Sequence, residues 1–235
     1  MKESLLSVKR LNWDSNFFKI EVGQIHLKNQ KISSIDEKDF DLIYIHSNTL
    51  IEDKESICYD KKITFSKVVS AHQKKITHSL IKKHTGLLKN SLLKLALDSG
   101  KYSRFKTDPK LSPYFIRLYT LWIQNSLNGS IADHVFIYEK ENEILGFVTL
   151  RKKDGFHQIG LIATSSSHRG LGIGSLLLQK VDNIVLSEGG SEVRVVTQLD
   201  NQLACNFYKK NDYKEYNTEY IYHLWSKTIL SSPSL

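Results

Sequence analysis

Residues 159–178 read IGLIATSSSHRGLGIGSLLL, and the organisation of the chain can be worked out from this stretch. It begins as an apolar run with strand character, passes through a polar turn into the segment RGLGIG, and continues as a helix with an apolar face. Glycines let the backbone approach an anion closely, and a helix N-terminus adds partial positive charge. The stretch therefore predicts a phosphate-binding loop.

Two known phosphate motifs differ from this segment. The P-loop requires lysine and then serine or threonine after its last glycine, whereas Gly174 is followed by Ser175 and Leu176. The dinucleotide fingerprint requires Gly-x-Gly-x-x-Gly, but here the spacing is Gly-x-Gly-x-Gly. The pattern Arg-x-x-Gly-x-Gly, which starts at Arg169, resembles the acyl-CoA pyrophosphate loop of the GNAT superfamily of N-acyltransferases. The alternative is a glycine-rich turn without a ligand.

Composition and charge set the outer bounds. The 235 residues can form one large domain or two small ones, and 40% hydrophobic with 25% charged residues is ordinary for a soluble globular protein. The formal net charge of +8 suits anionic partners such as CoA and nucleotide sugars. The lysines are spread along the chain, which indicates a solvated surface and gives no support for nucleic-acid binding.

The cysteine count and the apolar segments indicate the compartment. Cys58 and Cys205 are the only cysteines and lack metal-ligand spacing, so we expect no disulfide framework and no metal site. The first residues lack the apolar core of a signal peptide, and no segment approaches the roughly 18 apolar residues of a spanning helix. We expect a cytoplasmic protein without membrane insertion, and a homodimer as the commonest oligomer.

The chain divides into two predicted units. Before Gly100, a common type of helix stop, the patterns predict strands at 22–27, 41–46, 62–69 and 74–77, helical turns at 35–40 and a helix at 87–97. After it they predict a helix at 112–126, strands at 132–138, 144–151 and 158–164, a helix to 187, a strand at 192–198, a helix to 211 and a strand at 219–225. We expect a smaller N-terminal α/β unit over 1–98 on the substrate side, followed by a larger domain over 99–235.

The element order of the larger domain is similar to the GNAT core, so the expected fold class is α/β, a GNAT acyl-CoA N-acyltransferase fold with a smaller N-terminal α/β unit. Within that superfamily, the chain resembles the TDP-fucosamine acetyltransferase branch, which acetylates the 4-amino group of a TDP-4-amino-4,6-dideoxy sugar. The resembling segments are LNWDS at 11–15 with FF at 17–18, SRF at 103–105, GFVTL at 146–150 and VVTQ at 195–198.

The resemblance implies acetyl-CoA as the acyl donor. In GNAT enzymes the strand before the glycine loop, here 161–164, separates from the next strand, here 193–198. The pantetheine arm fills the gap, and a backbone N–H there polarises the thioester carbonyl. The residues implied for acetyl-CoA binding are Leu161, Ile162, Ala163, Arg169, Gly170, Leu171, Gly172, Ile173, Gly174 and Asn201.

Tyr208 is the predicted catalytic residue. It follows Asn201 by seven residues, about two helical turns, and therefore projects from the same helix face. In the family the matching tyrosine protonates the departing thiolate, and a phenol with a pKa of ~10 is a reasonable donor. The alternative is a core tyrosine, which is the role we expect for Tyr213, Tyr220 and Tyr222.

The predicted substrate-binding residues are Trp13, Ser15, Phe17, Phe18, Ser103, Arg104 and Phe105. An arginine can hold a phosphate through two hydrogen bonds, and we hypothesise that Arg104 faces the pyrophosphate of a nucleotide sugar. Dense aromatic residues are, alternatively, core residues, and Arg104 an exposed loop arginine.

The residues indicate no general base, because a strand histidine such as His134 is more often structural. No arrangement for an acyl-enzyme stands out, which favours direct transfer. The expected function is N-acetylation of a nucleotide-linked amino-dideoxy sugar for polysaccharide assembly. A GNAT enzyme that acetylates a protein amine or a polyamine, and a non-catalytic acyl-CoA-binding module, are the alternatives.

Overall fold

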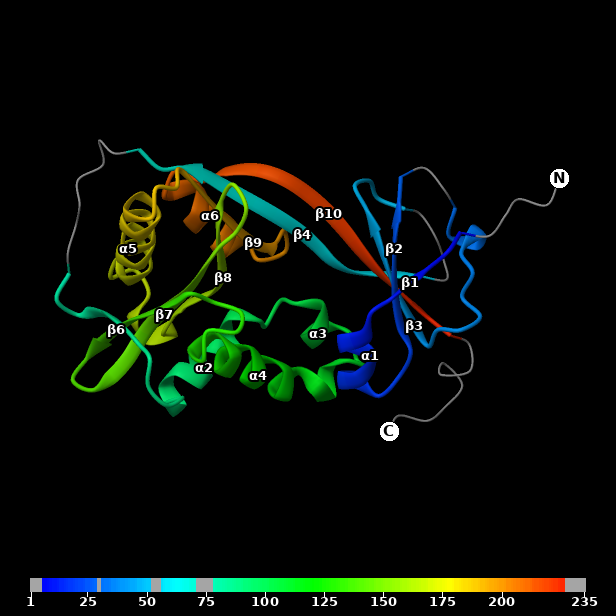
Figure 1. Ribbon diagram of the computed structural model, residues 1–235, viewed down its shortest axis with the longest axis horizontal. Helices are drawn as coiled ribbons and strands as arrows, with labels where there is room; N and C mark the ends of the chain where they lie inside the picture. The colour runs from blue at the N-terminus through cyan, green and yellow to red at the C-terminus, as the bar shows by residue number, and fades with distance from the viewer. Residues whose placement is uncertain (1–5, 29–30, 52–55, 71–77, 227–235) are drawn as a thin grey trace.

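The computed structural model describes residues 6–28, 31–51, 56–70 and 78–226. Within them, ten strands form one sheet in the order β1-β2-β3-β10-β4-β9-β8-β7-β6-β5, which runs along an elongated molecule (Figure 1). The strands are β1 (Lys9–Arg10), β2 (Val22–Leu27), β3 (Leu42–Ser47), β4 (Ile57–Val68), β5 (Ile81–Lys83), β6 (His134–Lys140), β7 (Glu143–Lys152), β8 (His157–Thr164), β9 (Glu192–Gln198) and β10 (Lys214–Trp225).

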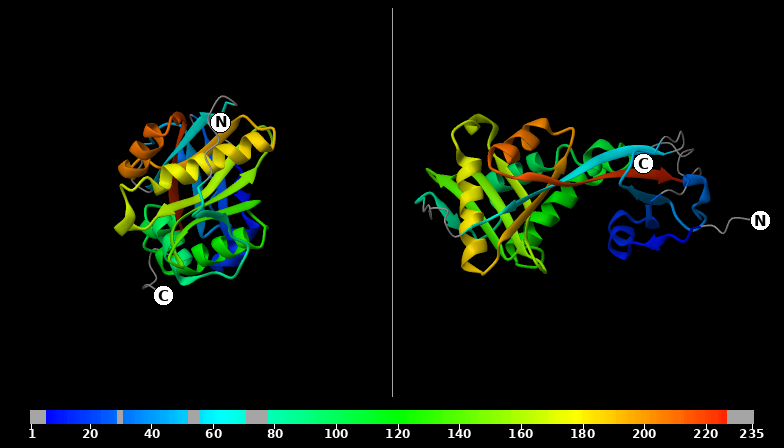
Figure 2. Two further views of the ribbon diagram at one scale, coloured as in Figure 1. Left: turned by 90° about the vertical axis from the view of Figure 1, so that its left-hand side faces the viewer. Right: turned by 90° about the horizontal axis from the view of Figure 1, so that it is seen from above.

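Two long strands connect the two ends of the molecule. β4 and β10 pair antiparallel over most of their length; β10 also pairs with β3, and β4 with β9 (Figure 1). Seen from above, they bridge the β1–β3 end and the end that holds α5 and β6–β9 (Figure 2). Strands from both sides of the predicted boundary at 98/99 thus share one sheet, and the two-unit division stays a prediction.

The helices cover both faces of the β6–β9 part of the sheet. α2 (Asn90–Ser99) and α4 (Phe115–Leu127) pack on one face, while α5 (Ile173–Ser187) and α6 (Gln202–Lys210) pack on the other. The apolar positions of α5 recur at helical spacing, so Leu177, Val181 and Val185 are fully buried against the strands. A short helix, α3 (Arg104–Thr107), and the 3-10 turn η2 (Ser112–Tyr114) precede α4.

The element order predicted from the sequence is confirmed for eight of the ten described strands and for α2, α4, α5 and α6, whereas β1, β5 and α3 are not predicted. Two further segments differ locally. The helical turn expected at 35–40 is instead the 3-10 turn η1 (Ile32–Ser34), and the polar residues after Trp13 belong to a helix, α1 (Asn12–Phe18). The strand expected at 74–77 lies outside the described residues.

Candidate active site

A cavity of about 750 Å³ opens among the strands and helices at the centre of the sheet. One group of lining residues comes from the glycine loop, β8, β9 and α6. A second group comes from the helices before β6 and from three neighbouring strands, β3, β10 and β4. Six polar residues of the second group are called the polar group: His46, Asp60, Lys62, Ser103, Arg104 and Tyr119.

The glycine loop has the geometry expected of an anion-binding loop. Gly170 and Gly172 have φ angles of +80° and +79°, which residues with a side chain rarely adopt, and Gly172 directly precedes α5. A Cβ on Gly174 would lie 2.9 Å from the Phe207 ring, so this glycine allows α5 to approach α6 closely. The backbone N–H groups that open α5 are therefore accessible to an anion beside the helix N-terminus.

Substitution of Gly172 by alanine is expected to weaken acetyl-CoA binding by at least 10-fold and to destabilise the protein by about 1–2 kcal/mol. Nothing lies within 4 Å of the added Cβ, so backbone strain alone causes the effect. The matched control is Gly155→Ala in the β7–β8 turn, where φ is also +80° and the surroundings are equally open. Calorimetric titration checks this prediction, and equal weakening in both variants would contradict it.

Strands β8 and β9 separate at the cavity. Their parallel pairing runs from His157 opposite Val193 to Ile159 opposite Val195 and then ends, although both strands continue. This is the gap that the resemblance implies for a pantetheine arm. The Leu161 N–H is not free to face that gap, because it donates to Thr149 Oγ1 at 2.8 Å.

Tyr208 and Asn201 line the same cavity. Asn201 is the N-cap of α6, and its Oδ1 accepts a hydrogen bond from the Ala204 N–H at 3.3 Å. The Tyr208 side chain is 4% exposed and packs against Phe65, Phe207 and Tyr213. Burial raises the pKa of its phenol well above the ordinary value.

The structure brings most of the predicted site residues together. Among the predicted acetyl-CoA residues all but Leu171, which is exposed, line the cavity, as do Ser103, Arg104 and Phe105. The residues predicted from the 13–18 stretch lie elsewhere. Phe17 and Phe18 are buried in an apolar cluster, and Trp13 stacks on Phe17. The Ser15 hydroxyl accepts a hydrogen bond from the Val22 N–H, so this stretch packs α1 onto β2 as the alternative interpretation expects.

Sequence reasoning missed several residues of the polar group. His46, Asp60, Lys62 and Tyr119 all line the cavity. Asp60 and Lys62 are two residues apart on β4, so the period of a strand places them on one face. The sequence carries that signal, but its apolar pattern predicts a strand only from residue 62.

Arg104 lines the cavity and lies between two aromatic rings, Tyr44 and the cavity-lining Phe105. Its guanidinium carbon is 4.4 Å from the Tyr44 ring centroid and 4.5 Å from that of Phe105. Its Nε is buried and has no hydrogen-bond partner among the described residues. A buried guanidinium N–H without an acceptor is costly, so this atom is a natural donor to a polar ligand.

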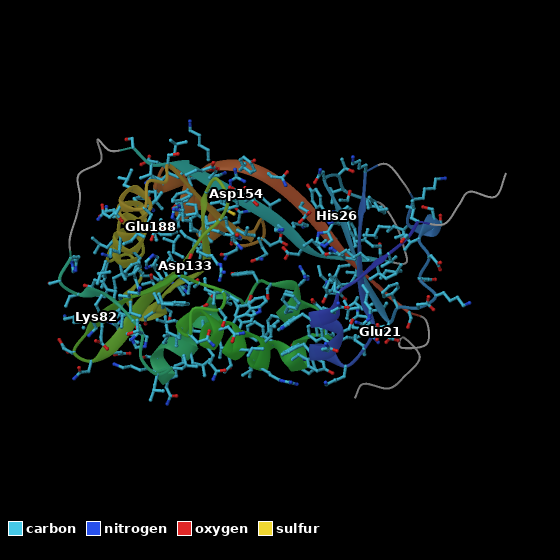
Figure 3. The ribbon with its side chains drawn as sticks, in the orientation of Figure 1. Glu21, His26, Lys82, Asp133, Asp154 and Glu188 are labelled. Carbon is cyan, nitrogen blue, oxygen red and sulfur yellow. The ribbon has the colours of Figure 1, made fainter. Side chains whose placement is uncertain are left out.

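Two histidine clusters lie on strands of the sheet. His26 and His46 stack near Glu219, whose pKa is lowered to about 2, first by the hydrogen bond with His46 and then by Lys62. Lys62 Nζ forms an ion pair with Glu219 Oε2 at 2.9 Å. The second cluster, His134 and His157 around Glu188, lies at the other end of the molecule, where Figure 3 labels Glu188, whereas His26 is on β2.

The site combines a gap between two strands with a glycine loop, a helix N-terminus and a buried tyrosine. This combination defines the class of protein. Solved structures show the same fold. A functionally unknown conserved protein from Staphylococcus epidermidis matches with a TM-score of 0.57 and 11% identity over 88% of this chain and 84% of its own. A tandem GNAT protein from the clavulanic acid biosynthesis pathway matches with a TM-score of 0.51 and 9% identity over 85% and 67%.

Residues 101–213 match the model of the Acetyltransferase (GNAT) family, and this part of the chain is a GNAT acetyltransferase domain. Acetyl-CoA is the acyl donor of GNAT acetyltransferases, and the loop and the strand gap fit it. Within the described part of the chain, no helix has both the length and the apolar character needed to cross a membrane.

Two curated relatives carry functional names. The Bacillus subtilis spore coat polysaccharide biosynthesis protein SpsD is 26% identical over 136 residues, which cover 57% of this chain and 47% of the relative. The Escherichia coli dTDP-fucosamine acetyltransferase is 29% identical over 133 residues, which cover 55% and 56%. The chain spans about half the length of the curated relatives it matches.

Proposed function

We propose that the protein is an acetyl-CoA-dependent N-acetyltransferase that acts on the amino group of a nucleotide-linked amino-dideoxy sugar. The observation that carries the proposal is that one cavity joins a GNAT glycine loop to a set of buried and half-buried polar side chains. The names of two relatives, one a dTDP-fucosamine acetyltransferase and one a polysaccharide biosynthesis protein, support the choice of acceptor.

The polar group supplies partners for such an acceptor. Asp60 Oδ1, Ser103 Oγ and Arg104 Nε are buried and have no hydrogen-bond partner among the described residues. Buried polar atoms are normally paired, so three unpaired atoms in one cavity indicate a polar ligand. Sugar hydroxyls and phosphates can satisfy a hydroxyl and a guanidinium, and Arg104 is suited to phosphate.

Different residues of the chain bind acetyl-CoA, donate the proton and orient the acceptor. When bound, acetyl-CoA supplies an activated acetyl thioester. The glycine loop and Arg169 would hold its pyrophosphate, and the gap between β8 and β9 would take the thioester arm in the cavity that Tyr208 also lines. The Tyr208 hydroxyl donates its proton to the departing thiolate sulfur, while the polar group orients the acceptor amine and excludes water.

The acceptor class is tested by thiol release from acetyl-CoA with a panel of amines. The panel holds TDP-4-amino-4,6-dideoxygalactose, its gluco epimer, a 3-amino isomer, polyamines and a lysine peptide. We expect kcat/KM for one amino-sugar nucleotide to exceed that for the polyamines and the peptide by at least 10²-fold. Faster turnover of the peptide or a polyamine would instead support a general amine acetyltransferase, and acetyl-CoA binding without turnover of any amine would support a binding module.

A further inference from the structure

Asp60 has an unusual position among the acidic residues of the protein. It lies on β4 opposite Ile221 of β10, and Ile221 lies opposite His46 of β3. The row His46, Ile221 and Asp60 therefore crosses three neighbouring strands, and all three residues line the cavity. Asp60 is only 6% exposed, whereas Asp98, the other carboxylate that lines the cavity among the described residues, is exposed.

One oxygen of the buried Asp60 carboxylate has no partner, and no cation pairs closely with this carboxylate within the described ranges. Asp108 accepts hydrogen bonds from two side chains, and Asp182 pairs with Lys67 Nζ at 2.8 Å. Asp60 Oδ1 has no hydrogen-bond partner within the described ranges, and none of the salt bridges found there involves Asp60. A buried oxygen without a donor is costly to the fold, and its position in the cavity leaves it available to an N–H group of a ligand.

The positive charges around Asp60 keep its carboxylate ionised near neutral pH, although none of them forms a close ion pair with it among the described residues. Burial raises its pKa to about 6, and Arg104 of α3 and then Lys62 of β4 oppose this effect. The Gln198 side chain of β9 also lowers the pKa by hydrogen bonding, while Glu219 of β10 raises it.

His46 of β3 and Tyr119 of α4, the other titratable members of the polar group, face the same cavity, whose lining also includes Asp98, Lys101, His168, Arg169, Tyr208 and Lys210. Burial raises the pKa of Tyr119 to about 12, so this phenol stays neutral near pH 7. Arg104 and Lys62 therefore supply the positive charge near Asp60, and the carboxylate is a stronger base than an exposed aspartate.

We propose that Asp60 is the general base of the acetyl transfer and accepts a proton from the acceptor amine. This inference rests on the proposed function and assigns the one role that the sequence leaves open. As the amine nitrogen forms its bond to the acetyl carbon and the carbon–sulfur bond breaks, Asp60 takes one N–H proton. Tyr208 gives its proton to the sulfur, and exchange with solvent then returns Asp60 to carboxylate and Tyr208 to phenol. No other reactant is needed.

The test compares Asp60→Asn with wild type, using the amine of the panel that wild type acetylates fastest. We expect kcat to fall about 10²-fold, within the range for loss of a general base, while the Kd for acetyl-CoA changes less than 2-fold. The limb of the wild-type kcat/KM profile near pH 6 should disappear in Asp60→Asn, and Asp60→Glu should restore part of the activity. Asp154→Asn, in the exposed β7–β8 turn labelled in Figure 3, is the control and should keep full activity.

Thermal stability separates a catalytic role from a structural one. Because burial of ionised Asp60 is unfavourable, Asp60→Asn should melt at the wild-type temperature or above it. A lower melting temperature with a proportional loss of acetyl-CoA binding would overturn the proposal in favour of a structural role.

The two proposals fail in different ways. Wild-type kcat and an unchanged pH profile in Asp60→Asn would overturn the role of Asp60 and leave the proposed function intact. Preferred turnover of a peptide or polyamine would overturn the proposed acceptor while Asp60 is still tested on that amine. A wild-type enzyme that turns over no amine would overturn both.

Discussion

Replacement of Tyr208 by phenylalanine is expected to lower kcat about 10³-fold while acetyl-CoA binding stays within 2-fold of wild type. The phenol lies in a cavity wall, is nearly fully buried and has a raised pKa, so it keeps its proton until a desolvated thiolate forms beside it. Phenylalanine preserves the ring packing against Phe65 and Phe207 and removes only the proton donor. Single-turnover measurement of thiol release, together with calorimetric titration of acetyl-CoA, checks this prediction.

The chain offers a closely matched control for this variant. Tyr213 packs against the Tyr208 ring with centroids 5.7 Å apart, yet it is not among the cavity-lining residues. Its hydroxyl is buried and has no hydrogen-bond partner among the described residues, so Tyr213→Phe removes no described interaction and should keep wild-type kcat. Equal turnover by Tyr208→Phe and Tyr213→Phe would remove Tyr208 from the mechanism.

Replacement of Asp108 by alanine is expected to lower the free energy of unfolding by about 2–6 kcal/mol, because two buried N–H donors lose their acceptor at about 1–3 kcal/mol each. Asp108 is fully buried, and its Oδ2 accepts hydrogen bonds from His223 Nδ1 at 2.5 Å and Trp225 Nε1 at 3.0 Å. These hydrogen bonds connect the segment after α3 to β10. Urea denaturation of Asp108→Ala and of the exposed control Asp154→Ala measures the difference, and a loss below about 1 kcal/mol would contradict the prediction.

The same contact gives stability a pH dependence of known sign. Burial lowers the pKa of His223, and the hydrogen bond to Asp108 only partly opposes this effect. The unfolded chain therefore binds more protons than the folded protein once the pH falls below the ordinary histidine value of 6.5. Stability is fully present above that pH and declines below it, and the lowered pKa of Asp108 acts in the same direction.

The features that were predictable from the sequence are those determined by neighbouring residues. The glycine loop was recognisable because Gly170 and Gly172 occupy conformations that glycine adopts without strain. The position of Tyr208 beside Asn201 follows from helical spacing, which holds in any tertiary context. Alternation and short apolar runs likewise identify eight of the ten described strands.

The rest depends on contacts between distant segments. Asp60 becomes part of the cavity only because β4 pairs with β10, more than 150 residues later in the chain, as in the register of Asp60 with Ile221. No pattern among neighbouring residues of the sequence predicts that strand pairing. The composition of the aromatic residues at 13–18 fits either a core or a pocket wall. The hydrogen bond between Ser15 and Val22, which is part of the contact of α1 with β2, decides for the core, and it too depends on tertiary contact.

The place of β10 between β3 and β4 has a consequence for how the molecule is made. β3 and β4 leave the ribosome early, but β10, which lies between them in the sheet, is translated more than 140 residues after the end of β4. Until then their facing edges carry unpaired N–H and C=O groups, which invite pairing with other chains. We expect a high contact order, slow folding after synthesis, and a need for chaperone protection during that interval.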